Sequence, residues 1–511
     1  LDGSVQPYAL YVPKKLPEGE APAMVFLLGR NERRTELAFL AEREAGAPPV
    51  SPTGAIVLVP YGRFCNATKF PGEVDVMEAL AATRARYQID AKRIAVGGFS
   101  MGGGSTWHLT AHYPGLWCAS TPGAGFAETP AFTKALAPGK EPRPVWEQTL
   151  WNLYDATLYA GNFFNVPTVA YTGEIDPQKQ ASDIMEVAMK GEGLTLERLI
   201  GPQTAHKYHP ETLKTLNTRM DALIAQGREA LPKEIRFTTY SLRYPSSAWV
   251  RIEGLGRHWE RADVKARLQD DGKVIVDTKN VTSLTLTEVQ PKEVILDGTT
   301  ITVSPGSKLH FTKTGDGWRQ SAHSESALRK RPGLTGPVDD AFMDSFLFVR
   351  PTGKPLHTSL GTWVESELMA ATTLWRHLYR GVIPVKSDRE LSDEDIANHN
   401  LVLWGDPSSN AVLARILPQL PLQWDAKTLT VRGINYPAAH HAPILIFPNP
   451  LNPARYVVIN SGIDFRADGS ASNALQTPKF PDWAVIDLRE APGPRWPGRV
   501  VTAGFFDEAW K

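Results

Sequence analysis

Short apolar segments alternate with amphipathic ones over the first 226 residues of the chain. Segments such as 23–28 (AMVFLL) and 55–59 (AIVLV) are continuously hydrophobic, which is typical of strands covered on both faces. Between them, 73–87 repeats its apolar residues with the 3.6-residue period of a helix. This alternation predicts an α/β fold with a doubly wound sheet.

The apolar period changes to two after residue 234, in a chain of 511 residues whose length predicts roughly three domains. Short alternating stretches, with turns at Asp271-Gly272 and Asp297-Gly298, predict an all-β, antiparallel sandwich. After a basic linker at 324–337, strand and helix patterns alternate again and predict a small, parallel α/β module. The predicted domains are 1–227, 234–322 and 338–511.

Charge and composition narrow the range of partners. Lys+Arg and Asp+Glu both number 55, so the formal net charge is zero, which argues against nucleic acid or an anionic membrane as the main partner. No apolar run reaches the length of about 18 residues that would span a membrane. The sequence begins with Leu1 instead of Met, so we expect a removed leader and a secreted or periplasmic protein. The oligomeric state stays open.

The cysteines and histidines do not predict a metal site. The chain has two cysteines, Cys65 and Cys118, which we expect to be free, partly buried thiols. The His440-His441 pair and the His206-x-x-His209 pair lack the further ligands that a zinc site needs. We therefore expect no metal site.

The strongest chemical signal is the segment 93–104, RIAVGGFSMGGG. It predicts a short strand, a Gly-x-Ser-x-Gly turn around Ser100, and a helix that begins near Ser105. A serine on such a tight turn needs very small neighbours, which Gly98 and Gly102 provide. The helix end behind Ser100 offers free N–H groups to a developing oxyanion. These features predict a nucleophilic serine.

An acid and a base follow Ser100 at later strand ends. Gly173-Glu174-Ile175-Asp176 follows the predicted strand 166–171, and we favour Asp176 over Glu174 as the acid. The loop after the last strand carries His206 and His209; we favour His206 as the base, since His209-Pro210 is well placed to start a helix. The order Ser, Asp, His is the one found in α/β-hydrolases.

Other residues are candidates to hold the substrate. The oxyanion would be bound by the N–H of Met101 and by a second amide, from Arg30 or Gly29, in the loop after strand 23–28. Tyr61 and Arg63 follow strand 55–59, at the sheet edge where crevices form. The insertion at 126–165 is rich in aromatic residues, half of which we expect in its own core. The predicted substrate contacts are Tyr61, Arg63, Trp107 and Trp151.

Four motifs carry a family resemblance: GGFSMGG at 97–103, His112-Tyr113-Pro114, Gly173-x-x-Asp176 and Ala205-His206. Together they resemble the prolyl-oligopeptidase-like serine hydrolases, and within that group they look closest to feruloyl esterases and polyhydroxybutyrate-depolymerase-like esterases. The resemblance covers about residues 5–226. It implies hydrolysis of an ester or a peptide through an acyl-enzyme, with no cofactor.

Three functions are compatible with these observations. The first is a carboxylesterase that acts on small-molecule or polysaccharide esters of the feruloyl or acetyl type. The second is a serine peptidase, for which Arg30, Arg33, Arg34 and Glu73 could clamp a peptide terminus. The third is a glycan-binding or scaffold protein with a residual hydrolase domain. Trp249, Trp259 and Trp318 of the sandwich could stack on sugars, but we favour core positions for them.

Overall fold

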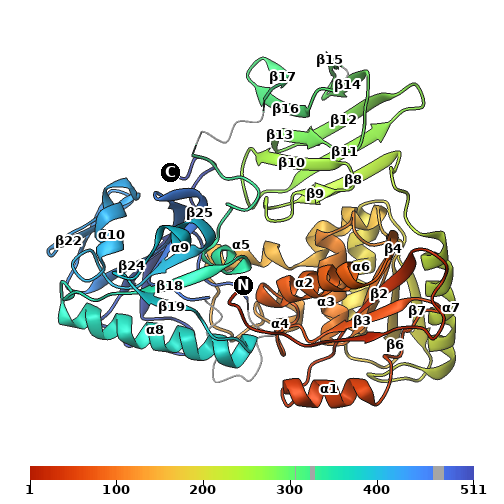
Figure 1. Cartoon of the computed structure of the whole chain (residues 1–511), viewed down its shortest axis with the longest axis horizontal. Coiled ribbons are helices and arrows are strands. Elements are labelled where there is room, and N and C mark those ends of the chain that lie inside the picture. Colours follow the sequence, from red (N-terminus) through yellow and green to blue (C-terminus); the bar gives the residue numbers. More distant parts are fainter. Residues whose placement is uncertain (305, 323–327, 464–476) are drawn as a thin grey trace.

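The computed structural model describes residues 1–304, 306–322, 328–463 and 477–511 (Figure 1). The strands of its first sheet are β1 (Tyr8–Tyr11), β2 (Ala21–Leu27), β3 (Ile56–Pro60), β4 (Ile89–Phe99), β5 (Ala119–Gly123), β6 (Val169–Gly173) and β7 (Glu197–Gly201). Their spatial order is β1-β3-β2-β4-β5-β6-β7; β1 is antiparallel to its neighbour and the others are parallel. The doubly wound sheet is confirmed, and its topology is that of the α/β-hydrolase fold.

Helices cover both faces of this sheet. They are α1 (Glu36–Glu44), α2 (Pro71–Arg86), α3 (Met101–His112), α6 (Lys179–Gly191) and α7 (Pro210–Gln226). Met24 and Phe26 of β2 pack in one core with residues of α1 and α7, whereas Ala23 and Val25 pack in another with residues of α2 and α3. Successive side chains of a strand point to opposite faces, so a continuously apolar strand can serve both cores.

The aromatic insertion lies between β5 and β6. Its elements are α4 (Thr129–Thr133), α5 (Val145–Leu150), η1 (Trp151–Leu153) and η2 (Ala156–Phe164). The buried carboxylate of Asp155 ties the segment together, because its Oδ1 accepts hydrogen bonds from the N–H (2.8 Å) and the Oγ1 (2.6 Å) of Thr129. As expected, several of its rings are buried, among them Trp151, Tyr159 and Phe163.

The second module contains two five-stranded sheets. Its strands are β8 (Glu234–Thr239), β9 (Ser246–Ser247), β10 (Val250–Leu255), β11 (Ala262–Leu268), β12 (Lys273–Lys279), β13 (Val281–Leu286), β14 (Glu293–Leu296), β15 (Thr299–Thr302), β16 (Leu309–Thr314) and β17 (Gly317–Gln320). The predicted turns at Gly272 and Gly298 connect hairpins, and both glycines have a φ of +82°. The expectation of a purely antiparallel module was wrong in one place, since β12 and β14 are parallel.

The third module is built on a seven-stranded sheet in the order β19-β18-β20-β25-β24-β26-β27. Its strands are β18 (Phe346–Arg350), β19 (Val385–Ser387), β20 (Asn400–Leu403), β24 (His441–Asn449), β25 (Asn452–Ile459), β26 (Trp483–Asp487) and β27 (Arg499–Gly504). Only half of it is parallel: β24, β26 and β27 pair antiparallel, so the predicted parallel layer is corrected to a mixed sheet. The hairpin between β24 and β25 accounts for this change of direction, since a short turn can join only antiparallel strands.

Further elements complete the third module. They are η3 (Val338–Met343), α8 (Thr358–Tyr379), α9 (Asp393–Asn398), α10 (Ala411–Ile416), η4 (Leu417–Gln419) and the three-stranded sheet β21 (Leu422–Trp424), β22 (Thr428–Val431) and β23 (Ile434–Pro437). The predicted linker at 324–337 begins outside the described residues, at 324–327. No helix in the described ranges has both the length and the apolar character needed to cross a membrane.

The three modules meet near the centre of the molecule (Figure 1). Phe70 and Tyr154 of the first module and Tyr244 of the second belong to the same hydrophobic core as the third module. Asp2 is a second link, because its carboxylate accepts hydrogen bonds from Arg63 of the first module (3.1 Å) and from the indole N–H of Trp375 on α8 (2.7 Å). The modules therefore share buried contacts in addition to their linkers.

Candidate active site

Ser100 occupies a sharp turn between β4 and α3. Its φ of 61° and ψ of −121° lie outside the regions that L-residues prefer, as expected for a strained nucleophile turn. The turn is possible because the backbone closes tightly around it: a Cβ on Gly98 would lie 2.6 Å from the carbonyl oxygen of Gly102, and one on Gly102 would lie 2.1 Å from that of Leu27. Both flanking positions therefore require glycine.

The structure brings Ser100, His206 and Asp176 into one hydrogen-bonded chain. His206 Nε2 lies 2.8 Å from Ser100 Oγ, and His206 Nδ1 lies 2.8 Å from Asp176 Oδ2. The Asp176 side chain is fully buried and also accepts the Gln178 N–H at 2.8 Å, whereas the His206 side chain is 40% exposed. This is the geometry in which an acid orients an imidazole that in turn faces a nucleophile.

The two alternative residues lie elsewhere. Glu174 accepts hydrogen bonds from the backbone and side chain of Gln203 at the surface. His209 caps the N-terminus of α7, where its Nδ1 accepts the N–H of Thr212. All four residues follow strand ends, so the choice rested on the Gly173-x-x-Asp176 spacing and on the position of His209 before the first residue of α7.

Aromatic rings support the loop that carries His206. Phe99 packs against the His206 ring with 4.9 Å between centroids, and Tyr208 packs against both Phe99 and Tyr171 at 4.7 Å. The Tyr171 hydroxyl donates to the carbonyl of Lys207 and accepts the N–H of His209. Sequence reasoning missed this support, because it joins residues from three separate strands and loops.

The loop after β2 passes directly beside the nucleophile turn. A Cβ on Gly29 would lie 3.6 Å from Ser100 Cβ, and Arg30 lines the same cavity as Ser100. Met101 is the first residue of α3, so its N–H has no acceptor within the helix. Both candidate segments therefore lie beside Ser100, and the binding of an oxyanion by their amides stays a prediction.

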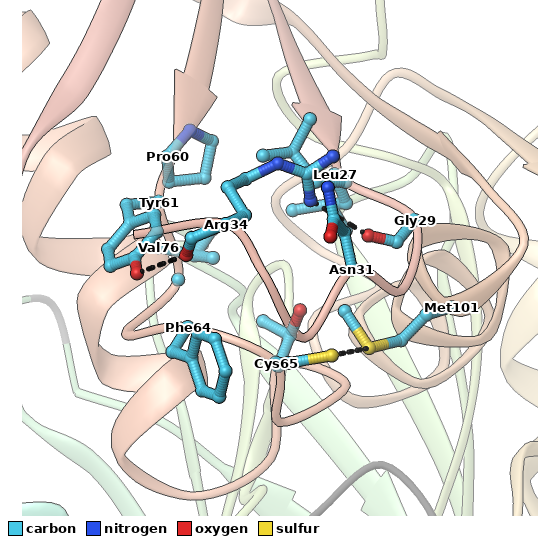
Figure 2. A pocket seen from close by; sticks show the side chains of 13 residues that line it. Leu27, Gly29, Asn31, Arg34, Pro60, Tyr61, Phe64, Cys65, Val76 and Met101 are labelled. Atoms are coloured by element: carbon cyan, nitrogen blue, oxygen red, sulfur yellow. Dashed lines mark hydrogen bonds between the residues drawn. The ribbon is translucent and has the colours of Figure 1, made fainter. Parts of the chain in front are cut away.

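A small cavity behind Met101 shows how this loop is held (Figure 2). Arg34 Nη1 donates to the carbonyl of Gly29 at 3.0 Å, and the Tyr61 hydroxyl donates to the carbonyl of Arg34 at 2.8 Å. On the opposite side of the cavity, Cys65 Sγ lies 3.8 Å from Met101 Sδ. These contacts connect the loop after β2 and the first turn of α3 to the segment that follows β3.

A larger cavity of about 260 Å³ opens over Ser100 and His206. Phe126 and Phe132 of the insertion form part of its wall; their rings stack with centroids 4.1 Å apart and 17° between planes. Phe126 also packs closely on α3, since a Cβ on Gly104 would lie 2.8 Å from its ring. The cavity is lined by Arg30, Ser100, Met101, Ala124, Gly125, Phe126, Phe132, Asp176, Pro177, Gln178 and His206.

The four predicted substrate contacts are corrected, because none of them lines this cavity in the described part of the chain. Tyr61 is buried and holds Arg34 as described above. Arg63 is buried in the ion pair with Asp2. Trp107 packs against Phe163 beneath the insertion, and Trp151 is buried in η1. The signal for Phe126 and Phe132 was present in the aromatic insertion, but the pattern did not distinguish wall residues from core residues.

A second group of ionisable side chains was not anticipated. Glu73, His108 and His112 place three potential ligand atoms within 4.8 Å of one another, all buried. Burial lowers the pKa of His108 to about 3 and that of His112 well below its usual value, so both imidazoles are neutral. The two oxygens of Glu73 accept hydrogen bonds from the hydroxyls of Tyr113 and Tyr244. This arrangement joins the first two modules.

Comparisons with known proteins find matches to part of this chain. No family model matches the chain. A segment of 123 residues is 32% identical to a probable chloroplastic glutamyl endopeptidase of Oryza sativa subsp. japonica, and one of 126 residues is 30% identical to its namesake from Arabidopsis thaliana. Each match covers 23% of this chain and 13% of the plant protein.

Solved structures similar to this chain include a thermostable esterase (21% identity, TM-score 0.32, 44% of this chain and 60% of that one). A putative dienelactone hydrolase from Klebsiella pneumoniae subsp. pneumoniae has 20% identity and a TM-score of 0.31, over 44% of this chain and 94% of that one. A ferulic acid esterase has 14% identity and a TM-score of 0.31, over 43% and 91%. By its own strand order and nucleophile turn, the N-terminal domain has the α/β-hydrolase fold, with Ser100 at the position that the nucleophile occupies in that fold.

Proposed function

We propose that this protein is a carboxylesterase that accepts esters with a flat, aromatic acyl group. The observation that carries the proposal is the stacked pair of Phe126 and Phe132 in the wall of the cavity over Ser100. Rings fixed in this way offer an apolar surface to a planar acyl group such as a cinnamoyl chain. Apart from Met101 and Pro177, the rest of the wall consists of short or polar residues, which leaves room for the ester carbonyl beside Ser100.

The reaction would begin with proton transfer from Ser100 Oγ to His206 Nε2 while the oxygen attacks the ester carbonyl carbon. The Met101 N–H and an amide at Gly29–Arg30 would bind the negative oxygen of the tetrahedral intermediate. His206 then returns its proton to the leaving alkoxide, and an alcohol departs from the acyl-enzyme. Asp176 accepts from His206 Nδ1, which fixes the tautomer and stabilises the imidazolium.

A second half-reaction would restore the enzyme. His206 takes a proton from a water molecule, whose oxygen attacks the acyl carbon. When this intermediate collapses, the Ser100–acyl bond breaks, His206 returns the proton to Ser100, and the carboxylic acid leaves. The 40% exposure of the His206 side chain allows water to reach this position.

The test measures kcat/KM for an aromatic and a small acyl ester in two variants, Phe132→Ala and a control. In Phe132→Ala, we expect kcat/KM for methyl ferulate to fall roughly 10- to 50-fold, while that for p-nitrophenyl acetate changes less than about threefold, because acetyl is too small to stack. Phe164→Ala is the matched control, since Phe164 is a half-buried phenylalanine beneath Arg236 and outside the cavity. Equal losses for both esters in Phe132→Ala would contradict the aromatic acyl site.

Peptide hydrolysis is a second candidate, favoured by the similarity to probable glutamyl endopeptidases. A glutamyl side chain is anionic, and Arg30 is the cationic residue in the cavity wall. Arg30 also bonds to Glu32, so a substrate carboxylate would have to compete with that residue. Turnover of a glutamyl p-nitroanilide that is lost in Arg30→Gln, with no turnover of methyl ferulate by the unmodified protein, would favour this function over the esterase.

A further inference from the structure

A groove of about 930 Å³ lies where the three modules meet, apart from the cavity over Ser100. The insertion contributes Trp146 on α5, the sandwich contributes the loop 256–260, and the third module contributes the segment from Ala503 to the end of the chain. The volume is at the upper end of the range of about 300–1,000 Å³ that is typical of ligand sites. The groove therefore has the size of a binding site for an extended ligand.

Polar contacts connect the three walls of the groove, which come from the insertion, the sandwich and the third module. His258 donates its backbone N–H to Glu508 Oε1 at 2.6 Å, and its Nδ1 lies 2.7 Å from Glu508 Oε2. Arg495 forms an ion pair with the buried Glu147 of α5, and Asn152 donates to the carbonyl of Trp259 at 3.2 Å. Because these contacts join side chains of all three walls, they hold the groove in shape, and a rigid site lowers the entropy cost of binding.

Aromatic rings supply most of the apolar surface of the groove. Trp259 and Phe505 lie side by side, with centroids 5.2 Å apart and planes tilted by 42°, and Trp146 lines the wall formed by α5. All three are half-buried, so each keeps part of its surface open. The largest aliphatic side chain in the wall is Val145.

The polar lining of the groove is balanced in charge. Arg257 and Glu260 form an ion pair at 2.8 Å, and Glu508 is bonded to His258. Such a lining offers both donors and acceptors without a net field that would select an anion or a cation. The charged residues of the wall are Arg257, Glu260, Arg432, Asp507, Glu508 and Lys511.

We propose that this groove binds a neutral oligosaccharide, at a site separate from Ser100. A pyranose ring has apolar C–H faces that pack on indole and phenyl rings, and its rim carries hydroxyls that both donate and accept hydrogen bonds. The combination of three open aromatic rings with balanced polar groups matches this chemistry. A peptide with a charged anchor or an anionic polymer would instead require a charge excess in the wall.

Oligosaccharide binding in the groove does not depend on the reaction at Ser100. It is therefore measured in the Ser100→Ala variant of the whole chain, where no ligand can be hydrolysed through Ser100. Titration calorimetry with xylohexaose, cellohexaose and chitohexaose should show binding of at least one, with a Kd of about 1 mM or tighter. Trp259→Ala and Phe505→Ala should each weaken that binding roughly tenfold or more. Phe164→Ala is the matched control and should bind as the parent does.

A further variant keeps the test valid if removal of Trp259 disturbs folding. Thr149 lines the groove from α5, so Thr149→Trp should fill the groove without removing a core side chain and should also abolish binding. Binding that is unchanged in Thr149→Trp would overturn the proposed location. Failure of all three hexaoses, or preferential binding of a tryptic digest of β-casein, would overturn the proposed ligand class.

Discussion

Two histidines of the N-terminal domain each lie close to a carboxylate, in very different surroundings. The ring of His206 contacts Asp176 and Ser100 at 2.8 Å each, and its side chain is 40% exposed at the edge of a cavity. His108 lies 4.0 Å from Glu73, and its side chain is 3% exposed. Burial, together with the positive charge of Lys69, lowers the pKa of His108 to about 3.

The difference shows that a histidine next to a carboxylate is not in itself a catalytic pair. A general base must gain and lose a proton at a place that substrate and water can reach. Glu73 is instead bonded to two tyrosine hydroxyls, one of them from the sandwich module, so its role is to join modules. We infer that His206–Asp176 acts in chemistry and that His108–Glu73 acts in stability, and each side of this comparison can be tested.

The largest expected effect comes from removing the nucleophile. If Ser100 is the nucleophile, Ser100→Ala should lower kcat for p-nitrophenyl acetate by about 10⁶-fold, as loss of the nucleophile does in a serine protease. The melting temperature should stay within a few degrees of the parent value, since the side chain is small. Fluorophosphonate labelling with peptide mapping provides the second readout: label on a residue other than Ser100 would contradict the assignment.

Asp176→Asn should have the next largest effect, with kcat reduced by about 10⁴-fold. An amide in place of the carboxylate leaves the geometry intact but favours the wrong tautomer of His206. Glu174→Gln is the matched control, because Glu174 follows the same strand but its side chain bonds to Gln203 at the surface. If Glu174→Gln lost more activity than Asp176→Asn, the acid would have to be reassigned.

A pH experiment tests how burial affects a carboxylate that lies outside the chain of Ser100, His206 and Asp176. Burial raises the pKa of Asp75, on α2, from 3.8 to about 6. Between about pH 4 and 6 the folded form therefore binds more protons than the unfolded form, and stability falls as pH rises through this window. Asp75→Asn removes this contribution, which corresponds to about 3 kcal/mol.

The measurement is denaturant unfolding of the parent and of Asp75→Asn at several pH values. We expect the difference in the free energy of unfolding between the two proteins to change by that amount across the window and to be constant above it. The pH dependence of kcat should be the same in both proteins. A constant stability difference over the whole range would mean that Asp75 is ionised in the folded protein at low pH.

The smallest expected effect is that of Glu73→Gln. The amide can replace the carboxylate as acceptor for only one of Tyr113 and Tyr244 without rearrangement, so we expect the protein to be destabilised by about 1–3 kcal/mol. Its kcat for p-nitrophenyl acetate, measured below the melting temperature, should stay within about twofold of the parent value. A large loss of kcat in the folded variant would show that the buried pair does reach the chemistry.

The chain of Ser100, Asp176 and His206 could be predicted because its signals are local. Each residue follows a recognisable strand, and Gly98 and Gly102 are needed by the turn itself. The same holds for the doubly wound sheet and for the hairpins at Gly272 and Gly298, whose patterns extend over only a few residues.

Other features depend on contacts between distant segments and could not be predicted. Tyr61 stands at the expected sheet edge, but its hydroxyl donates to the carbonyl of Arg34, and the residue does not line the cavity over Ser100. The third sheet is mixed because β24 lies between β25 and β26 and runs antiparallel to both. The periodicity of apolar residues does not indicate which strands become neighbours. The groove joins residues such as Trp146, Trp259 and Phe505, which no local pattern relates.

The hydrophobic core shared by the modules limits how this architecture can be altered. Phe70, Tyr154 and Tyr244 are buried together with residues of the third module. A hydrolase domain that ends at residue 227 would expose Phe70 and Tyr154 to solvent. The resulting hydrophobic patch would promote aggregation. Exchange of one module between homologues, by recombination or by design, would therefore succeed only if the partner surfaces were exchanged with it.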